Sequence, residues 1–581
     1  MNGVLTRLAG RLRTGDLVTG ISRLLALACL VGLVGMLPWL SGKDPALTIL
    51  RATSSDREPT PEVLASIRKS IGIDGGPLHV IGHWLAGVAR GDLGRSWVSG
   101  ADVGPDAVDA FGVSLSLMAA ALGVGVIVAA ALVLPALRDG LRGRPRPRGG
   151  AASAVLISLP EYLLAPILML VLAVYLRILP PFGWGSPEKV IMPALSLGLP
   201  TGGYLGGLVS DAVTATFSER WVATWSTAGI SGRPLAGAVL RRALAPLTGQ
   251  VALVVVALTG GAVAVEKIFA IPGLGRELLD AASAQDVPAL QAQILLLLAL
   301  ALTTGVIAGA VRRLLMGRAA GAGGLTAPPP VEHPGRAARV IAVSGAALLA
   351  LMVAVGIRRD PYAVVADKLA QPSAALPLGA DSLGRDVLAR VAHGAVSTVS
   401  GAVIVTVVCF VIAILVGLAP RAATGFIEVA NAAPPILAGL IVAGVSGPSA
   451  TGAAIAVAGV GWAPLASHAA GLVAENRQRP DVLLAPVLGE GRVRITLTRV
   501  LPAVVGPLAR HAALRLPGKA LALAALGFLG LGAQSPAPEW GLVLSDALPY
   551  IERAPWAVAT PAAALVILSI TSVATSRSMR R

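Results

Sequence analysis

Cysteine and charge are both scarce in this sequence. Cys29 and Cys409 are the only cysteines among 581 residues, and both lie inside apolar runs. Two such residues provide neither a disulfide framework nor a cysteine-ligated metal site. Charged residues make up 13% of the chain, whereas soluble domains carry roughly 25%. The composition therefore predicts an integral membrane protein.

Motifs for nucleotide hydrolysis or covalent catalysis are also missing. The nearest approach to a P-loop is "LPGKA" at 516–520, which lacks the upstream glycine and the Ser/Thr that hold phosphate and Mg²⁺. The patterns HExxH, GxSxG and CxxC do not occur. We therefore expect no enzyme active site, no metal site and no cofactor bound by this chain.

Long apolar runs take up much of the sequence and reach the ~20 residues that a helix needs to cross a bilayer. The alternating ten-residue segments of an outer-membrane barrel are not seen, so the fold class is predicted to be all-α and polytopic. About twelve spans are expected, near residues 21–40, 111–136, 152–179, 191–216, 248–266, 288–311, 339–357, 395–419, 428–446, 450–472, 503–532 and 556–576.

The distribution of basic residues predicts the orientation. The segment "RDGLRGRPRPRGG" at 138–150 is strongly basic, and such segments remain on the cytoplasmic side. This places both termini in the cytoplasm and assigns the net charge of +16 to topology and lipid contact, not to nucleic acid. The first apolar run follows Arg7, Arg11 and Arg13 like a signal peptide, but no A-x-A site follows it, so a retained first helix is expected.

A Gly/Pro-rich stretch divides the chain into two halves. Residues 317–337 have no apolar periodicity, as is typical of a linker. The expected domains are a first unit at 1–316 with a large outer region at 43–110, the cytoplasmic linker at 317–337, and a second unit at 338–581. Six spans in each half give the two units the same orientation, as in a fused pair of subunits.

Each half also has a long basic loop between its fourth and fifth spans, at 218–246 and 475–502. In each loop, about two turns of possible helix run into a glycine, Gly229 or Gly489, which permits the left-handed turn that ends a helix. A short helix on the cytoplasmic face, followed by a second helix that returns to the membrane, is predicted. An ordinary basic interfacial loop is the alternative.

At this point the sequence resembles a known family, the dipeptide/oligopeptide/nickel permeases of ABC importers, with the two usual membrane subunits fused end to end. The two loops look like EAA loops, in which a short helix docks on a cytoplasmic ATPase. The matching stretches are "GIDGGP" (72–77), "GDLGRS" (91–96), "EKIFAIPGLGRELLDAASAQDVPALQ" (266–291), "LGADSLGRDVLARVAHGAVS" (378–397) and "GFLGLGAQSPAPEWG" (527–541).

The resemblance implies residue roles. ATPase docking is implied for Trp221, Val222, Ala223, Thr224, Ala228, Gly229, Ile230, Ser231, Val482, Ala485, Leu488, Gly489, Glu490 and Gly491. Outer-face contact with a substrate-binding protein is implied for Asp92, Arg276, Asp286, Arg385, Asp386 and Trp540.

Both loops depart from the family pattern. The first loop lacks the two usual basic residues before Gly229, and Pro486 replaces an arginine in the second. Proline in a helix interior costs about 3 kcal/mol, so the second short helix is expected to start near Pro486 or to be kinked there.

The implied function is the permease component of an ABC importer in the cytoplasmic (inner) membrane. It would move di- or oligopeptides by alternating access, with two partner ATPase domains that bind ATP and Mg²⁺ and with an extracytoplasmic substrate-binding protein. Nickel chelates, glutathione or haem are alternative substrates. An ion-coupled secondary carrier and a membrane scaffold are the alternatives from other classes.

Ionisable residues inside the spans would favour the carrier, since proton and ion relays use them. Glu161, Asp211, His468, Arg515 and Lys519 are available, and interfacial solvation is the favoured interpretation of all five. For the charged segment 378–394, an outer amphipathic helix is expected, with Asp386 and Arg390 paired at i, i+4 and exposed to water and headgroups.

Overall fold

The computed structural model describes residues 21–26, 28–37, 46–47, 49–50, 58–70, 76–145, 150–284, 286–316 and 336–578. Over these residues the chain is helical, and its β-structure is limited to the isolated bridges Arg95–Asp102, Val364–Arg385 and Ala380–Asp386. This confirms the predicted all-α class. Most of the predicted linker lies outside the described residues; its last two residues, 336 and 337, begin helix α15.

Eight of the described helices are long and apolar enough to cross a membrane. They are Val103–Leu141, Arg233–Ile268, Val287–Leu315, Arg339–Gly356, Val387–Gly417, Ala450–Asn476, Arg492–Leu529 and Pro555–Thr575. Each corresponds to one of the predicted spans.

The remaining four predicted spans appear in other forms. Two are shorter apolar helices, Ile21–Gly35 and Glu161–Tyr175. The third is α9 (Pro187–Phe217), and the fourth is a pair, α17 (Pro420–Ala432) and α18 (Pro435–Ser446), whose apolar parts meet at 90°. The pair corrects the expectation of one continuous span at 428–446. Proline disfavours the α conformation at the residue before it, and Ala433, before Pro434, is extended.

The chain forms two compact units, each built from segments of both sequence halves. Unit 1 consists of Met1–Gly104, Ala281–Ala292 and Gly394–Leu542, and unit 2 consists of Pro105–Asp280, Gln293–His393 and Val543–Arg581. The bundle of each half therefore has its own unit, completed by helices from the other half.

In unit 1, the first apolar helix packs against the second half. The Ser22 hydroxyl donates to the carbonyl of Ala422 at 2.6 Å, and Arg23 forms a 2.7 Å ion pair with Glu428 of α17. The other helices of this unit are α4 (Pro61–Ser70), α5 (Pro77–Ala89), most of α16 (Val387–Gly417), α18, α19 (Ala450–Gly461), α20 (Ala463–Asn476), α21 (Pro480–Leu483), α22 (Arg492–Ile495), η5 (Thr496–Val500) and α23 (Leu501–Leu529), with the start of α24 (Trp540–Ala547).

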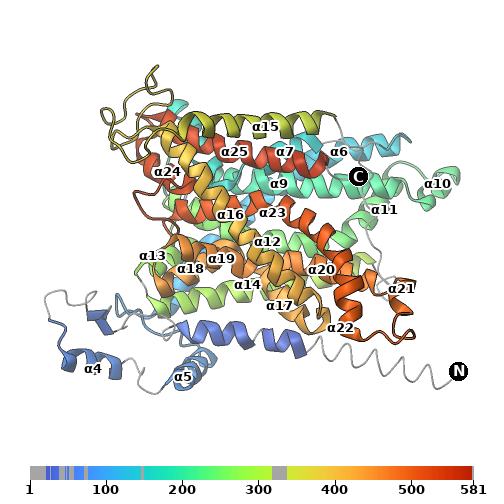
Figure 1. Cartoon of the computed structure of the whole chain (residues 1–581), viewed down its shortest axis with the longest axis horizontal. Coiled ribbons are helices and arrows are strands. Elements are labelled where there is room, and N and C mark those ends of the chain that lie inside the picture. The colour runs from blue at the N-terminus through green and yellow to red at the C-terminus, as the bar shows by residue number, and fades with distance from the viewer. Residues whose placement is uncertain are drawn as a thin grey trace. The chain divides into compact units, whose positions relative to one another are not determined.

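In unit 2, helices of the second half complete the bundle of the first half. Helices α15 (Arg336–Gly356) and α25 (Pro555–Ser578) of the second half lie side by side (Figure 1), and α25 also contacts α7 (Gly150–Ile157) of the first. The other helices are α6 (Val103–Leu141), α8 (Glu161–Leu168), η2 (Met169–Tyr175), α9, α10 (Arg220–Thr227), α11 (Arg233–Leu244), η3 (Ala245–Leu247), α12 (Thr248–Ile268), most of α13 (Leu274–Ala284), most of α14 (Val287–Met316), the rest of α24 and η6 (Leu548–Tyr550).

Small residues explain the packing of α9. Gly198, Gly202 and Gly206 recur every four residues, and a Cβ on Gly198 would lie 2.6 Å from the carbonyl oxygen of Ala121 on α6. Glycines at this spacing allow two membrane helices to approach closely. They also keep the average hydropathy of α9 low, although the helix is 31 residues long.

Candidate functional site

The first predicted docking loop folds as a short helix that is anchored by one apolar side chain. Val222 of α10 is 6% exposed and packs in a cluster with Phe217, Leu235 and Val239. Gly229 follows the helix with φ = 82°, the left-handed turn that the sequence predicts. The next helix, α11, leads through η3 into the span α12.

The other residues predicted for docking in this loop lie on its surface. Trp221 is half-buried, donates its indole N–H to Glu219 at 2.7 Å, and packs edge-on against Trp225 with ring centroids 5.3 Å apart. The exposed members are Ala223, Thr224, Ala228, Gly229, Ile230 and Ser231. Trp225 is also exposed and was not predicted.

The second loop has the same plan but a shorter helix. α21 spans only Pro480–Leu483, so the expectation of a helix that starts or kinks at Pro486 is wrong. The reason is local: proline disfavours the α conformation at the residue before it, and the chain turns before it reaches Pro486. Gly489 has φ = 81°, as predicted.

Two buried residues anchor this loop, and its apolar tip is exposed. Val482 and Ala485 are buried, whereas Leu488, Gly489 and Gly491 are exposed and Glu490 is half-buried. The exposed apolar side chains, which we call the apolar tip, are Leu483 (60%), Leu484 (59%), Val487 (82%) and Leu488 (74%). Only Leu488 was predicted; an apolar residue in a short loop carries no periodicity that could reveal its exposure.

One arginine of the returning helix holds each short helix in place. In the first loop, Arg242 of α11 pairs with Glu219 at 3.0 Å. In the second, Arg499 of η5 pairs with Glu490 and donates to the carbonyl of Asp481 at 3.1 Å. The pairing with Arg499 also keeps the pKa of Glu490 below its usual value. Each short helix is therefore tied to the helix that leads into the membrane span.

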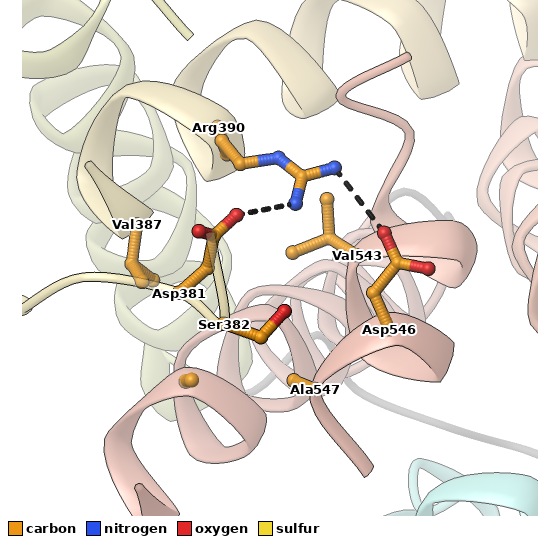
Figure 2. A pocket seen from close by; sticks show the side chains of 8 residues that line it. Asp381, Ser382, Val387, Arg390, Val543, Asp546 and Ala547 are labelled. Carbon is orange, nitrogen blue, oxygen red and sulfur yellow. Dashed lines mark hydrogen bonds and ion pairs between the residues drawn. The ribbon is translucent and has the colours of Figure 1, made fainter. Parts of the chain in front are cut away.

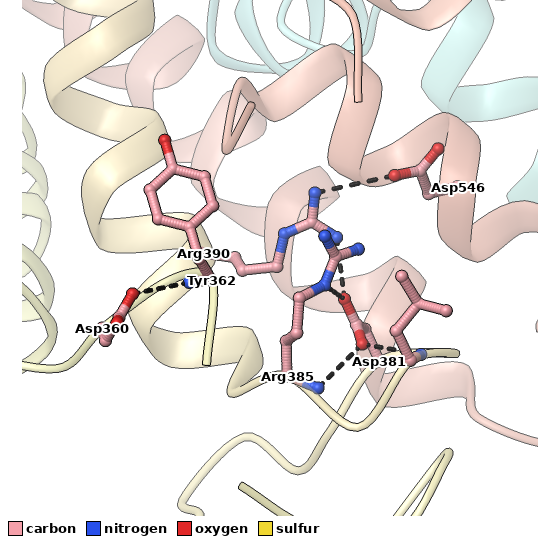
Figure 3. A network of polar contacts seen from close by, with 7 residues as sticks. Asp360, Tyr362, Asp381, Arg385, Arg390 and Asp546 are labelled. Atoms are coloured by element: carbon pink, nitrogen blue, oxygen red, sulfur yellow. Dashed lines mark hydrogen bonds and ion pairs between the residues drawn. The ribbon is translucent and has the colours of Figure 1, made fainter. Parts of the chain in front are cut away.

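The charged segment 378–394 contains a buried network, not exposed charges. Asp381 accepts hydrogen bonds from Arg385 Nε at 2.7 Å and from Arg390 at 2.8 Å, and Arg390 also reaches Asp546 at 3.6 Å (Figure 3). Asp386 pairs with Arg359 at 2.7 Å instead of with Arg390. All four charged residues from Asp381 to Arg390 are buried, which corrects the prediction that they face water.

The same residues start α16 and line a small pocket. Asp386 Oδ1 accepts the backbone N–H of Leu388 at 2.8 Å, so Asp386 caps the helix. The pocket is lined by Asp381, Ser382, Val387, Arg390, Val543, Asp546, Ala547 and Ala557 (Figure 2). Burial raises the pKa of Asp546. Burial acts on Asp381 in the same direction, but the backbone N–H groups of Arg385 and Leu383 and the Arg385 guanidinium outweigh it, so the pKa of Asp381 is lowered.

The six residues predicted for outer-face contacts differ in exposure. Asp92 is exposed and Arg276 half-buried. Asp286 is buried and accepts from the Ser96 hydroxyl and, at 3.0 Å, from the Trp97 backbone N–H. Arg385, Asp386 and Trp540 are also buried. Their role as binding-protein contacts stays a prediction, and in this structure only Asp92 and Arg276 are accessible to a partner.

Each unit contains one buried carboxylate that the sequence did not reveal. In unit 2, Glu266 accepts from the Ser114 hydroxyl at 2.5 Å and from the Arg276 backbone N–H, in the first turn of α13, at 3.0 Å. In unit 1, Glu539 accepts from Thr398 at 3.2 Å and from the N–H groups of Gly541 and Leu542 at the start of α24. Burial raises the pKa of Glu539 to about 7.

The fold and the loops together define a polytopic membrane protein of two repeated helical bundles, each with a surface-exposed loop that contains a short helix. The family described as "Binding-protein-dependent transport system inner membrane component" matches residues 150–320 and 410–579, once in each half and including both loops. The chain belongs to this family and is the transmembrane permease component of an ABC importer.

Individual relatives agree with this assignment. The chain is 36% identical to the peptide transport system permease protein SapC of Escherichia coli over 202 residues, which cover 33% of this chain and 67% of SapC. It is 34% identical to the di/tripeptide transport system permease protein DppC of Pseudomonas aeruginosa, over 34% of this chain and 67% of DppC. It is 33% identical to the glutathione transport system permease protein GsiC of Salmonella choleraesuis, over 51% of this chain and 91% of GsiC.

Proposed function

We propose that this permease moves di- or oligopeptides inward across the cytoplasmic membrane, from an extracytoplasmic substrate-binding protein and with energy from two partner ATPase domains. The substrate class is supported by the similarity to SapC and DppC, which are named for peptide transport. The chain itself has no P-loop sequence, so ATP and Mg²⁺ would be bound and ATP hydrolysed in the partner subunits.

The observation that carries this proposal is the repeated loop. Each half presents one loop with a short helix, an exposed tip and a glycine in the left-handed region after the helix, and an arginine salt bridge joins the loop to the next membrane helix. One such loop per half matches two ATPase domains. The apolar tip in unit 1 would bury its exposed leucines and valine in a partner, because apolar surface removed from water is stabilising.

The loops would face the cytoplasm, together with both termini. The basic segment 138–150 supports this orientation, since short loops rich in Lys and Arg remain on the cytoplasmic side. A chain of this family with several apolar helices would then lie in the cytoplasmic membrane, with its binding protein on the opposite face.

Reconstitution tests the proposal. The chain would be purified with its ATPases, placed in proteoliposomes with the binding protein, and assayed for ATP-dependent uptake of a labelled dipeptide. Gly229→Val and Gly489→Val would each lower uptake at least tenfold, because a β-branched residue does not tolerate φ near +80°. Gly237→Val is the matched control: Gly237 lies within α11, has no positive φ and has open space around it. Uptake driven by a proton gradient without ATP would contradict the proposal.

Glutathione, itself a tripeptide, is a second candidate substrate. It is favoured by GsiC, whose match extends over 91% of its own length and 51% of this chain. Direct uptake distinguishes the two: at equal concentration, ATP-dependent uptake of labelled glutathione should exceed that of a labelled dipeptide if glutathione is the cargo, and the reverse is expected if dipeptides are the cargo.

A further inference from the structure

Four carboxylate side chains from two helices gather in unit 2. Asp106 and Asp109 are three residues apart at the start of α6, and so lie on the same side of the helix. Glu277 and Asp280 have the same spacing on α13. Glu277 interacts electrostatically with the other three and with the buried Glu266. We call Asp106, Asp109, Glu277 and Asp280 the acidic cluster.

The acidic cluster is open to solvent on one side and ends at a buried amide on the other. The three aspartates are exposed and Glu277 is half-buried. Gln293 of α14 is 3% exposed, and its Nε2 donates to Glu277 Oε2 at 3.5 Å. Its Oε1 is buried and has no hydrogen-bond partner among the described residues. A buried acceptor without a donor is costly, so the amide indicates a place for an N–H group from outside the chain.

The second half contains a counterpart of this region, and the register of α6 and α16 identifies it. Each of these helices begins at a valine, and eleven residues later a hydroxyl, of Ser114 or Thr398, donates to a buried glutamate. In this register, Arg390 of α16 takes the place of Asp106 of α6.

α13 and α24 correspond in the same way. In both helices, the backbone N–H of the third residue donates to the buried glutamate of its own half. Asp280 therefore corresponds to Asp546, and Glu277 corresponds to Val543. Because Val543, Asp546 and Arg390 line one pocket (Figure 2), the acidic cluster is the counterpart of that pocket in the first half.

In the second half, a cation of the chain occupies this place. The guanidinium of the buried Arg390 lies between Asp381 and Asp546, at 2.8 and 3.6 Å (Figure 3). In the first half, Asp106 replaces the arginine and Glu277 replaces an apolar residue. The first half thus adds two carboxylates at the place where the second half has its guanidinium.

Two basic residues of the first half act on the edge of the acidic cluster. Arg276 Nε is 4.0 Å from Asp280 Oδ2, and Lys267 also interacts electrostatically with Asp280. Glu277 is in a different environment: burial and the neighbouring carboxylates raise its pKa to about 7. A cation beside Glu277 would favour the ionised carboxylate, so it should be bound more tightly as pH rises through 7.

The arrangement favours an organic cation over a metal ion. The described residues contain no group of three or more His, Cys, Asp or Glu side chains that could hold a metal. An ammonium or guanidinium group is held instead by N–H donation to carboxylate and amide oxygens. The counterpart Arg390 is itself such a cation.

We infer that the acidic cluster binds the free ammonium group of the peptide, in the place that Arg390 takes in the second half. Glu277 and Gln293 would accept its N–H groups, and the exposed aspartates would attract it from solution. The ammonium group suits a permease for varied peptides, because it is independent of their side chains. The inference therefore rests on the proposed peptide transport.

Asp106→Arg tests the register, because it supplies the cation within the chain. The guanidinium would pair with Glu277 and Asp280, so the thermal midpoint of the purified full chain should rise by about 2 °C or more. Glu188→Arg is the matched control, since Glu188 is exposed in the first turn of α9 and makes the same change of charge outside the cluster. It should not raise the midpoint. Equal changes in the two variants would overturn the inference.

A binding measurement tests the ligand. For the purified full chain at pH 7.5, trialanine should raise the thermal midpoint more than N-acetyltrialanine, which lacks the positive charge. Glu277→Gln and Asp106→Arg should each remove the difference, and Glu188→Gln should keep it. At pH 5.5 the difference should shrink, because Glu277 is then protonated. Equal midpoints with the two peptides in the wild type at pH 7.5 would overturn the inference.

A basic side chain of the binding protein offers the same chemistry, and its affinity for the chain is therefore measured as well. At least tenfold weaker binding to Asp106→Arg than to Glu188→Arg, with equal midpoints for the two peptides, would assign the acidic cluster to the binding protein and overturn the peptide assignment. The proposed function is judged separately by ATP-driven uptake in the wild type, on which the thermal midpoints do not depend.

Discussion

At the scale of single residues, burial decides what a charged side chain does in this protein. Arg95 and Arg385 occupy the same place in the related stretches "LGRS" and "LGRD". The side chains of Arg95 and its partner Asp102 are 77% and 69% exposed, whereas those of Arg385 and Asp381 are 4% and 8% exposed. An exposed pair contributes about 0–1 kcal/mol, but a buried charge that loses its partner is strongly destabilising.

Asp381→Asn should therefore destabilise the chain by about 3–5 kcal/mol, because Arg385 and Arg390 would lose their shared anionic partner. The measurement is the thermal midpoint of the detergent-purified chain. Asp102→Asn is the matched control and should leave the midpoint almost unchanged. Similar shifts in the two variants would show that the buried network does not stabilise the fold.

The buried carboxyl of Glu539 should make stability depend on pH. Its pKa rises from 4.5 to about 7 on folding, so between these values the folded state binds more protons than the unfolded state. Stability then falls as pH rises from about 5 to 7, by ~3 kcal/mol. Glu277 of α13, whose pKa burial also raises to about 7, acts in the same direction.

The check is the thermal midpoint at pH 5 and pH 8. The wild type should melt at a lower temperature at pH 8, and Glu539→Gln should reduce the difference. Glu552→Gln, at an exposed position, is the control and should leave it as in the wild type. An unchanged difference in Glu539→Gln would contradict the assignment.

Single-residue environments were the least predictable part of the candidate site. The sequence indicated that Asp386 and Arg390 could pair along a helix, but Asp386 instead caps α16 and pairs with Arg359. Periodicity along one segment contains no information about a partner such as Asp546, which is far away in the sequence. The glycines were predictable, because Gly229 and Gly489 require a positive φ for a local reason.

At the scale of elements, the two predicted docking loops combine an anchored base with an exposed tip. The apolar tip formed by Leu483, Leu484, Val487 and Leu488 has no counterpart of equal hydrophobicity in the first loop, whose exposed residues include Thr224 and Ser231. We therefore expect the second loop to contribute more of the ATPase affinity.

Leu488→Asp should lower recovery of the ATPase in co-purification at least tenfold and should leave the chain folded, because the side chain is 74% exposed. Leu383→Asp places the same substitution at an exposed leucine outside the loops and should have no effect on the ATPase. The comparison is made by quantifying both proteins after tag purification. Normal recovery of the ATPase with Leu488→Asp would exclude the apolar tip as the docking surface.

The salt bridge between Arg499 and Glu490 should couple movement of the short helix to the following membrane span. It should contribute little to the affinity for the ATPase. Arg499→Gln is expected to leave ATPase binding and hydrolysis within about twofold and to lower peptide uptake severalfold, because the short helix is no longer tied to the following span. The readout is the number of peptides transported per ATP hydrolysed. A parallel loss of hydrolysis and uptake would assign the pair to docking instead.

The existence of most elements could be predicted, but not their interruptions. The twelve apolar runs all appear as helices among the described residues, yet the run at 152–179 is broken near Pro160 and the run at 428–446 near Pro434. Proline marks both places in the sequence. Hydropathy averages over such breaks, because a window of about nineteen residues responds to total apolar content.

At the scale of the whole molecule, the sequence halves and the compact units do not coincide. The division of the sequence at residues 317–337 stays a prediction, but the helix of Ile21–Gly35 packs with the bundle of the second half, and α15 and α25 complete unit 2. Hydropathy could not predict this exchange, because a pattern of spans does not specify which bundle a helix joins.

The exchange predicts that the halves assemble without the covalent link. Fragments 1–316 and 338–581, expressed together with a tag on one, should co-purify in a 1:1 ratio, because each unit buries helices of both. Either fragment alone should give little folded protein. Independent purification of two stable, separate fragments would contradict the exchanged architecture.

Because each unit contains helices of both halves, the fusion of the halves in one chain also fixes their ratio at one to one. If the halves were separate chains, each bundle would accept a completing helix from any available copy, so homodimers would compete with the productive pair. A covalent link makes the meeting of the two halves intramolecular and so raises the effective concentration of the correct partner. Every polypeptide synthesised then carries its own complement, and assembly no longer depends on equal expression of two genes.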